Sequence, residues 1–289
     1  MLTSGVKTGV ELNNKWHQQR GSRTNDVAGA NDNFPLVSIV TIVLNDADHI
    51  EETIQSVLSQ SYNYKEYIVI DGGSTDGTLD LIQKYDNQID YWVSEPDGGV
   101  YNAINKGIKQ CQGSIIKIIN SGDTLAPCAI ERAIDYFEDT GLGNRQIVRS
   151  YINLTALNGD VINVIDDKGA SRFYPSILHP SWYVPKKVYE EVGLYCTNFA
   201  VAADYEFYQR AYKCGIEFLT IPESMASFRV GGISGSGLRG QHEVFCINCR
   251  YQGALIAVYV YSLNIGQRVL NRVKRLWLFI TGGEKGGCN

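Results

Sequence analysis

The feature that most constrains the fold is an apolar run that stops abruptly at a polar turn, Ile118-Ile119-Asn120-Ser121-Gly122-Asp123. A short buried strand followed by such a turn predicts that Asp123 lies at the carboxyl edge of a β-sheet, where open α/β sheets bind ligands. Magnesium or manganese bound to a nucleotide diphosphate needs only one or two protein carboxylates, because phosphate oxygens and water complete its shell. Asp123 is therefore a candidate ligand for Mn²⁺ or Mg²⁺, although these residue types also make ordinary turns.

Strands and helices alternate around this segment. Residues 36–44 form a nearly continuous β-branched run, which is typical of a strand covered on both faces. Further strands are predicted over 66–70, 91–93 and 113–119, with helical spacing of apolar residues between them. This α/β alternation predicts a mostly parallel sheet flanked by helices.

Two more acidic residues occupy positions that suit a ligand site. Asp71 follows the strand over 66–70, so its carboxylate could accept the ring N–H of a nucleotide base, or it could serve only the turn. Asp204 is predicted in the first turn of a helix, where the macrodipole stabilises a carboxylate. Before that helix, residues 147–154 and 161–165 predict a hairpin with its turn at Asn158-Gly159.

Composition divides the chain and limits its partners. Residues 1–33 lack a sustained apolar period and are predicted to be a flexible extension, followed by a folded domain over 34–238 and a helical segment over 239–289. The net charge of -5 argues against a nucleic-acid partner. Seven cysteines and a start without an apolar signal segment predict a reducing, cytoplasmic location.

The segment over 251–280 predicts an amphipathic helical tail. Its first part is uncharged but is interrupted by polar residues and glycine, so it falls short of the roughly 20 apolar residues that span a bilayer. Basic residues between 268 and 275 then precede Leu276-Trp277-Leu278-Phe279-Ile280, a pairing suited to a bilayer surface. We expect peripheral contact with the inner face of the cell membrane. The alternative is a helix packed on the domain or on a second copy in a homodimer.

Several segments together resemble glycosyltransferase family 2, and in particular bacterial enzymes that build exopolysaccharide, colanic-acid-type and O-antigen units. They are residues 37–41, 69–78, 95–99, 102–107, 120–123 and 203–206. The resemblance implies a GT-A (Rossmann-like) fold, a nucleotide-diphosphate sugar donor, a divalent metal and inversion at the anomeric carbon. The acceptor would be a saccharide or a lipid-linked saccharide.

The resemblance also assigns roles to residues. Asp204 resembles the catalytic base, Asp123 the last acid of the metal-binding region, and Asp71 the aspartate that reads the base. Asn120 and Gly122 stand where relatives often carry acids, so Asp123 alone must hold the ion. The predicted donor-binding residues are Val43, Asn45, Asp71, Gly73, Asp97, Asn105, Ser121, Gly122, His179 and Arg229. His179 could equally be structural, and Arg229 could belong to an ordinary surface loop.

Two other functions remain open. A sugar nucleotidyltransferase would carry a glycine-rich phosphate loop with Arg and Lys after the first strand, where this chain has Asn45-Asp46-Ala47-Asp48. A catalytically silent nucleotide-sugar binding or scaffold protein would account for the sparse acids of the metal region.

Overall fold

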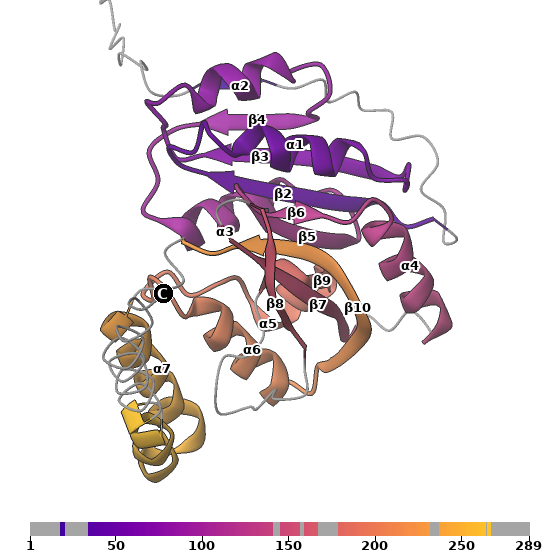
Figure 1. The fold of residues 1–289 in the computed structure, drawn as a ribbon. Helices are drawn as coiled ribbons and strands as arrows, with labels where there is room; N and C mark the ends of the chain where they lie inside the picture. Colours follow the sequence, from indigo (N-terminus) through magenta and orange to yellow (C-terminus); the bar gives the residue numbers. More distant parts are fainter. Residues whose placement is uncertain are drawn as a thin grey trace, which may run out of the picture.

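The computed structural model describes residues 18–20, 34–140, 145–156, 159–166, 179–231, 237–263 and 265–266. Four parallel strands form the centre of its sheet, in the spatial order β4 (Tyr91–Ser94), β3 (Lys65–Asp71), β2 (Val37–Val43) and β5 (Ile115–Asn120) (Figure 1). All seven residues of β2 are buried between its two neighbours. A strand covered on both faces needs such a continuous apolar run.

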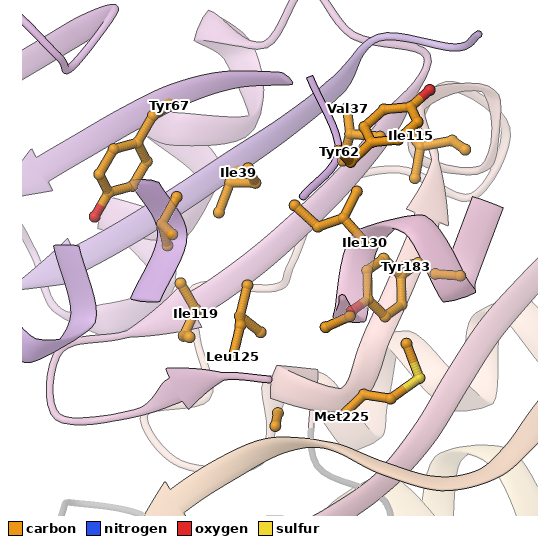
Figure 2. Close-up of a cluster of buried hydrophobic side chains, with 14 of the residues drawn as sticks. Val37, Ile39, Tyr62, Tyr67, Ile115, Ile119, Leu125, Ile130, Tyr183 and Met225 are labelled. Carbon is orange, nitrogen blue, oxygen red and sulfur yellow. The ribbon is translucent and has the colours of Figure 1, made fainter. Parts of the chain in front are cut away.

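Helices cover both faces of this sheet. One apolar cluster joins the sheet to α1 (Ile50–Leu58), α2 (Thr78–Lys84) and α4 (Ala129–Asp139). A second cluster joins its other face to α3 (Val100–Gln110), α5 (Lys186–Val192) and α6 (Ala203–Lys213). Figure 2 shows the first cluster, where Ile39 of β2 and Ile130 of α4 lie among its side chains. The predicted sheet flanked by helices is therefore confirmed.

One glycine explains how closely α3 approaches the sheet. A Cβ atom built on Gly107 would lie only 2.3 Å from Val40 Cγ1 of β2. Any larger residue would push α3 away from β2. Gly107 lies in the second half of α3, so this contact holds that half of the helix against β2.

The second half of the sheet is mixed. β7 (Gln146–Thr155) and β8 (Val161–Ile165) form the predicted hairpin, and β9 (Trp182–Pro185) runs antiparallel to β5 and β7. β10 (Glu217–Arg229) is parallel to β7 and antiparallel to β6 (Thr124–Leu125). The expectation of a mostly parallel sheet thus holds for β4, β3, β2 and β5, and antiparallel pairing dominates beyond them.

Elements at both ends of the described chain add to this fold. β1 (Gln18–Arg20) pairs with β4, a strand that the sequence analysis did not predict within its flexible extension. At the other end, α7 (Gly237–Gln252) packs against α6 (Figure 1), and a further helix covers 254–263. No described helix has both the length and the apolar character to cross a membrane. Half of the predicted membrane-contacting segment over 251–280, residues 264 and 267–280, lies outside the described residues.

Candidate functional site

Loops at the carboxyl edge of the central strands are tied together by hydrogen bonds. Asn45, after β2, accepts the backbone N–H of Thr75 at 2.8 Å and donates its own N–H to Ser74 Oγ at 2.7 Å. Ser121, after β5, donates its hydroxyl to Asp46 Oδ2 at 2.6 Å. The predicted residues Asn45 and Ser121 therefore belong to one connected rim of loops.

Two predicted glycines shape this rim. Gly73 and Gly122 have φ angles of 87° and 86°, in the left-handed region that side chains disfavour. A Cβ on Gly73 would also lie 3.2 Å from the backbone nitrogen of Pro96. Glycine at these two positions lets the loops after β3 and β5 turn sharply beside the strand ends.

Asp71 ends β3 and is completely buried. One carboxylate oxygen accepts the N–H groups of Gly73 and Ser74, at 3.2 and 3.0 Å, and the Ser94 hydroxyl at 2.5 Å. The other oxygen accepts the Ser74 hydroxyl. A carboxylate has about four acceptor positions, so Asp71 organises the loop after β3. Its role in reading a base stays a prediction.

Asp123 lies between β5 and β6 and is 3% exposed. Its Oδ1 accepts the backbone N–H of Arg229 at 3.2 Å, because β6 pairs with the end of β10. Its Oδ2 accepts the side-chain amide of Asn120 at 3.2 Å. Burial raises the pKa of the Asp123 carboxyl to about 7, against the opposing effect of these hydrogen bonds. The carboxylate would therefore gain from a nearby cation.

Lys117 is a completely buried lysine on the strand that leads to this loop. It lies on β5, donates to the carbonyl oxygen of Pro180 and places its Nζ 4.3 Å from the centre of the Tyr183 ring. Burial lowers the pKa of Lys117 to about 7, and the charge of Asp123 opposes this shift. Neither contact of Lys117 supplies a full negative charge, so Lys117 and Asp123 only partly offset each other's burial.

A continuous line of polar contacts joins Asp123 to Asp204. The Asn120 side chain that donates to Asp123 has its Oδ1 3.3 Å from His179 Nε2. His179 Nδ1 in turn lies 3.6 Å from Asp204 Oδ2. The structure thus brings together three residues that are far apart in the sequence and were predicted separately, namely Asp123, His179 and Asp204.

Asp204 lies in the first turn of α6, as predicted, and is 8% exposed. Its Oδ1 accepts the backbone N–H of Tyr205 at 2.8 Å and lies 3.4 Å from the Tyr101 hydroxyl. Burial raises the pKa of Tyr101, and the charge of Asp204 adds to this effect. Tyr101 therefore remains a neutral hydrogen-bond donor beside the carboxylate.

Arg229 is the last residue of β10 and lies beside Asp123. Its backbone N–H binds the Asp123 carboxylate, while its guanidinium contacts Glu52 Oε2 at 2.6 Å. Glu52 is in the first turn of α1 and its side chain is 57% exposed. Arg229 is therefore part of an ordered strand, and the glycine-rich residues 232–236 after it lie outside the described residues.

The other predicted donor-binding residues have mixed surroundings. Val43 is buried at the end of β2, where its carbonyl oxygen accepts the N–H of Gly72 at 2.9 Å. Asp97 is half-buried, and its Oδ1 accepts the N–H of Gly99 at 2.8 Å. Asn105 uses both ends of its amide on the backbone of Tyr195, at 2.8 and 3.0 Å. Asn105 thus supports the scaffold behind the site.

Comparison with known proteins decides the family. The model for glycosyl transferase family 2 matches residues 38–168. An uncharacterised glycosyltransferase of Mycobacterium tuberculosis is 31% identical over 186 residues, which cover 61% of this chain and 69% of that protein. This chain belongs to glycosyltransferase family 2. Another relative of this family-2 glycosyltransferase is Bacillus subtilis TuaG, 36% identical over 105 residues, which cover 35% of this chain and 42% of TuaG.

Solved structures share the fold of this family-2 glycosyltransferase. Staphylococcus aureus TarS aligns with a TM-score of 0.57 and 17% identity over 76% of this chain, although this covers only 43% of TarS. The mannosyltransferase PcManGT of Pyrobaculum calidifontis, in complex with GDP-Man and Mn²⁺, aligns with a TM-score of 0.59 and 20% identity over 86% of this chain and 79% of PcManGT. The GT-A fold that the sequence resemblance implied is confirmed.

The residues of this family-2 glycosyltransferase fit a divalent metal bound together with a diphosphate. Within the described residues, no three His, Cys, Asp or Glu side chains group closely enough to hold a metal unaided. Asp123 supplies one carboxylate, which suffices where phosphate oxygens and water complete the shell. Burial raises the pKa of Asp123, and a bound cation would stabilise the charged carboxylate. This is the second observation that fits a metal at Asp123.

Three residues of the site were missed by the sequence analysis. Tyr101 directly follows the loop of Asp97, and Glu52 lies in a predicted helix; neither carried a signal of its own. Lys117 did carry one, because it is the only charged residue within the six-residue strand β5. A charge in the middle of a buried strand indicates a functional or paired group.

Proposed function

We propose that this family-2 glycosyltransferase transfers a sugar from a nucleotide-diphosphate donor to a hydroxyl of a saccharide or lipid-linked saccharide, with inversion at the anomeric carbon. The observation that supports this most is the line of contacts from Asp123 through Asn120 and His179 to Asp204. This line of contacts supports the proposal because it connects the candidate metal ligand with the candidate base. A single displacement needs these two groups together, one on each side of the reacting carbon.

Asp204 would accept the proton of the attacking hydroxyl as the new glycosidic bond forms. His179 would hold the carboxylate of Asp204 in place through the 3.6 Å contact of its Nδ1. The bond from the anomeric carbon to the diphosphate oxygen breaks on the opposite face, and its electrons leave with the nucleoside diphosphate. These groups convert a bimolecular reaction into an oriented one within the site.

The leaving diphosphate requires positive charge. Asp123 would hold Mn²⁺ or Mg²⁺, which when bound neutralises charge that develops on the diphosphate. Arg229 is a second cation beside Asp123, and its guanidinium could bind a phosphate oxygen after leaving Glu52. PcManGT, which contains GDP-Man and Mn²⁺, supports a donor and a metal of these classes.

The nucleoside would lie along the rim formed by the loops after β2, β3 and β4. Val43, Asn45, Gly73 and Asp97 line this rim, and Asp71 fixes its shape. We retain the prediction that the Asp71 carboxylate accepts the ring N–H of the base, which would replace one of its present donors from the loop after β3. Ser121 and Gly122 would approach the diphosphate, since their loop contains Asp123.

The pathway would be cell-surface polysaccharide synthesis, as in exopolysaccharide, colanic-acid-type or O-antigen units. TuaG is named for teichuronic acid biosynthesis, which supports this setting. Residues 34–238 would form the catalytic domain in the cytoplasm, and residues 251–280 would attach it peripherally to the inner face of the membrane. Leu255, Tyr259 and Leu263 are exposed apolar residues on the helix that opens this segment. A homodimer could cover the same residues.

The experiment that tests this function measures release of nucleoside diphosphate from UDP-, GDP- and dTDP-sugars with Mn²⁺, in the presence of lipid-linked saccharides. We expect sustained release from one nucleotide class, with the labelled sugar found in the lipid fraction. A chain that binds nucleotide sugars but releases no nucleoside diphosphate from any of them would be a binding protein, and the proposal would be wrong.

A further inference from the structure

The helix that contains Asp204 begins without a cap from its own sequence. Ala202 occupies the N-cap position of α6 and provides no side-chain hydrogen bond. The first backbone N–H groups of a helix need acceptors from elsewhere. The Tyr101 hydroxyl accepts the N–H of Asp204, and Asp204 Oδ1 accepts that of Tyr205, so the start of α6 depends on the position of the segment that leads into it.

Glu243 of α7 accepts hydrogen bonds from this segment. Its Oε1 accepts the backbone N–H of Ala200 at 3.0 Å, and its Oε2 accepts those of Val201 and Ala202 at 2.9 and 3.0 Å. The residue is only 7% exposed. Burial acts to raise the pKa of Glu243, but hydrogen bonds from these three N–H groups and from Arg239 hold it below its usual value. Glu243 is thus a charged acceptor for residues 200–202, and it also pairs with Arg239 at 3.3 Å.

The segment held by Glu243 also contacts the surroundings of Asp204. The Tyr101 hydroxyl donates to the carbonyl oxygen of Val201 at 2.8 Å and accepts the backbone N–H of Asp204 at 3.4 Å. A displacement of Val201 would therefore move Tyr101 and Asp204 together. Val244 and Ile247 of α7 pack against Ala202, which leaves little room for such a displacement in the intact chain.

We infer that Glu243 is a positioning residue for Asp204, and that α7 is part of the catalytic scaffold as well as the start of the C-terminal segment. This inference rests on the proposed role of Asp204. Misplacing a catalytic group by about 1 Å can cost on the order of 100-fold in rate. The carboxylate of Glu243 thus acts on the reaction without touching a substrate.

The test compares Glu243→Gln with Gln252→Ala in the full chain. The glutamine variant presents an amide NH₂ where an oxygen accepted N–H groups, so it cannot keep all three hydrogen bonds. Gln252 donates to Gln209 at 2.8 Å, further along the same helix pair, whereas Glu243 accepts from residues 200–202. We expect faster amide hydrogen exchange at residues 200–202 by at least about tenfold in Glu243→Gln alone.

Turnover provides the second readout, with GDP-mannose and UDP-N-acetylglucosamine as donors and Mn²⁺ present. At a temperature where both variants are folded, we expect Glu243→Gln to lower kcat by about 10- to 100-fold with donor KM within about twofold. Gln252→Ala should stay within about threefold of wild type. Unchanged amide exchange, or equal kcat for the two variants, would overturn the inference.

Asp204→Asn, measured in parallel, separates the two claims. Loss of turnover in Asp204→Asn together with wild-type turnover in Glu243→Gln overturns only the role of Glu243. Wild-type turnover in Asp204→Asn overturns the proposed role of Asp204, on which the inference about Glu243 rests. Loss of turnover in both, with amide exchange altered only in Glu243→Gln, supports both.

Discussion

His179 Nδ1 lies 3.6 Å from Asp204 Oδ2, and the opposite ring nitrogen lies 3.3 Å from Asn120 Oδ1. The imidazole therefore lies between the amide oxygen of Asn120 and the carboxylate of Asp204. His179 is 8% exposed, so this arrangement is shielded from bulk water. The histidine links the two halves of the site, which come from β5 and α6.

Replacement of His179 should affect the chemical step more than donor binding. We expect His179→Ala to lower kcat by about 10- to 100-fold, because Asp204 loses the group that orients it. The donor dissociation constant should change by less than about threefold. The exposed residue His242 on α7 provides the control, and His242→Ala should behave as wild type. An equal loss in both variants would contradict the account.

Glu52 and Arg229 should have opposite effects on donor affinity. The guanidinium of Arg229 is held by Glu52 at 2.6 Å, so a diphosphate must compete with this carboxylate. We expect Glu52→Gln to tighten nucleoside-diphosphate binding about two- to fivefold, since exposed ion pairs are weak. Arg229→Met should weaken it about tenfold or more, because a charge-assisted hydrogen bond is lost.

Calorimetric titration with GDP and UDP in the presence of Mn²⁺ measures both effects. The neighbouring residue Glu51 pairs with Lys84 at 2.6 Å instead, so Glu51→Gln should leave the affinity unchanged. Weaker binding in Glu52→Gln would show that Glu52 contributes to the donor site and that the competition does not exist.

Lys117 should make stability depend on pH. Burial lowers the pKa of Lys117 from 10.5 to about 7, so between these values the unfolded chain binds one more proton and stability rises with pH. The raised pKa of Asp123, about 7, has the opposite effect only below that pH. Buried tyrosines with a raised pKa, such as Tyr67 and Tyr183, oppose this gain as the pH approaches 10. We therefore expect the free energy of unfolding of the wild type to gain about 2 kcal/mol relative to Lys117→Met from pH 8 to 9.5.

Chemical denaturation at a series of pH values measures this gain. Lys187 is exposed on α5, so Lys187→Met is the matched control and should keep the wild-type slope. If Lys117→Met retained the same slope, the buried lysine would be charged in the native protein at neutral pH.

Local sequence patterns predicted most of the central fold. The β-branched run over 36–44 and the polar turn before Asp123 are local signals, and the parallel strands place such turns at one edge. β10 was missed because Pro222 and Glu223 interrupt its pattern, at the place where its register against β7 shifts. Its pairing partners are also distant in sequence, and no local pattern specifies them.

The three acidic residues of the candidate site could be predicted from the sequence, but most of their hydrogen-bond partners could not. Asp71, Asp123 and Asp204 each follow a recognisable strand end or helix start. One of the four hydrogen bonds to Asp71 comes from Ser94, which lies on another strand. The two hydrogen bonds between the Asn105 side chain and the backbone of Tyr195 form only because α3 packs against a loop that is distant in the sequence. Glu243 looked like an ordinary helix residue, since its three partners lie about 40 positions earlier.

The effect of the metal on nucleoside-diphosphate binding should require Asp123. We expect EDTA to weaken GDP or UDP binding to the wild type by at least about tenfold, because the diphosphate loses its shared cation. Asp123→Asn should bind weakly with or without Mn²⁺. Asp135 is exposed on α4, so Asp135→Asn should keep the wild-type response to Mn²⁺. Equal binding by Asp123→Asn and wild type in Mn²⁺ would place the metal elsewhere.

The most direct test of the proposed function is the turnover of Asp204→Asn, measured together with its donor affinity. An amide of nearly the same size cannot accept the hydroxyl proton, so we predict a fall in kcat of about 100- to 10,000-fold. The donor dissociation constant should stay within about threefold of wild type. Wild-type turnover in Asp204→Asn would contradict the assignment of Asp204 as the base.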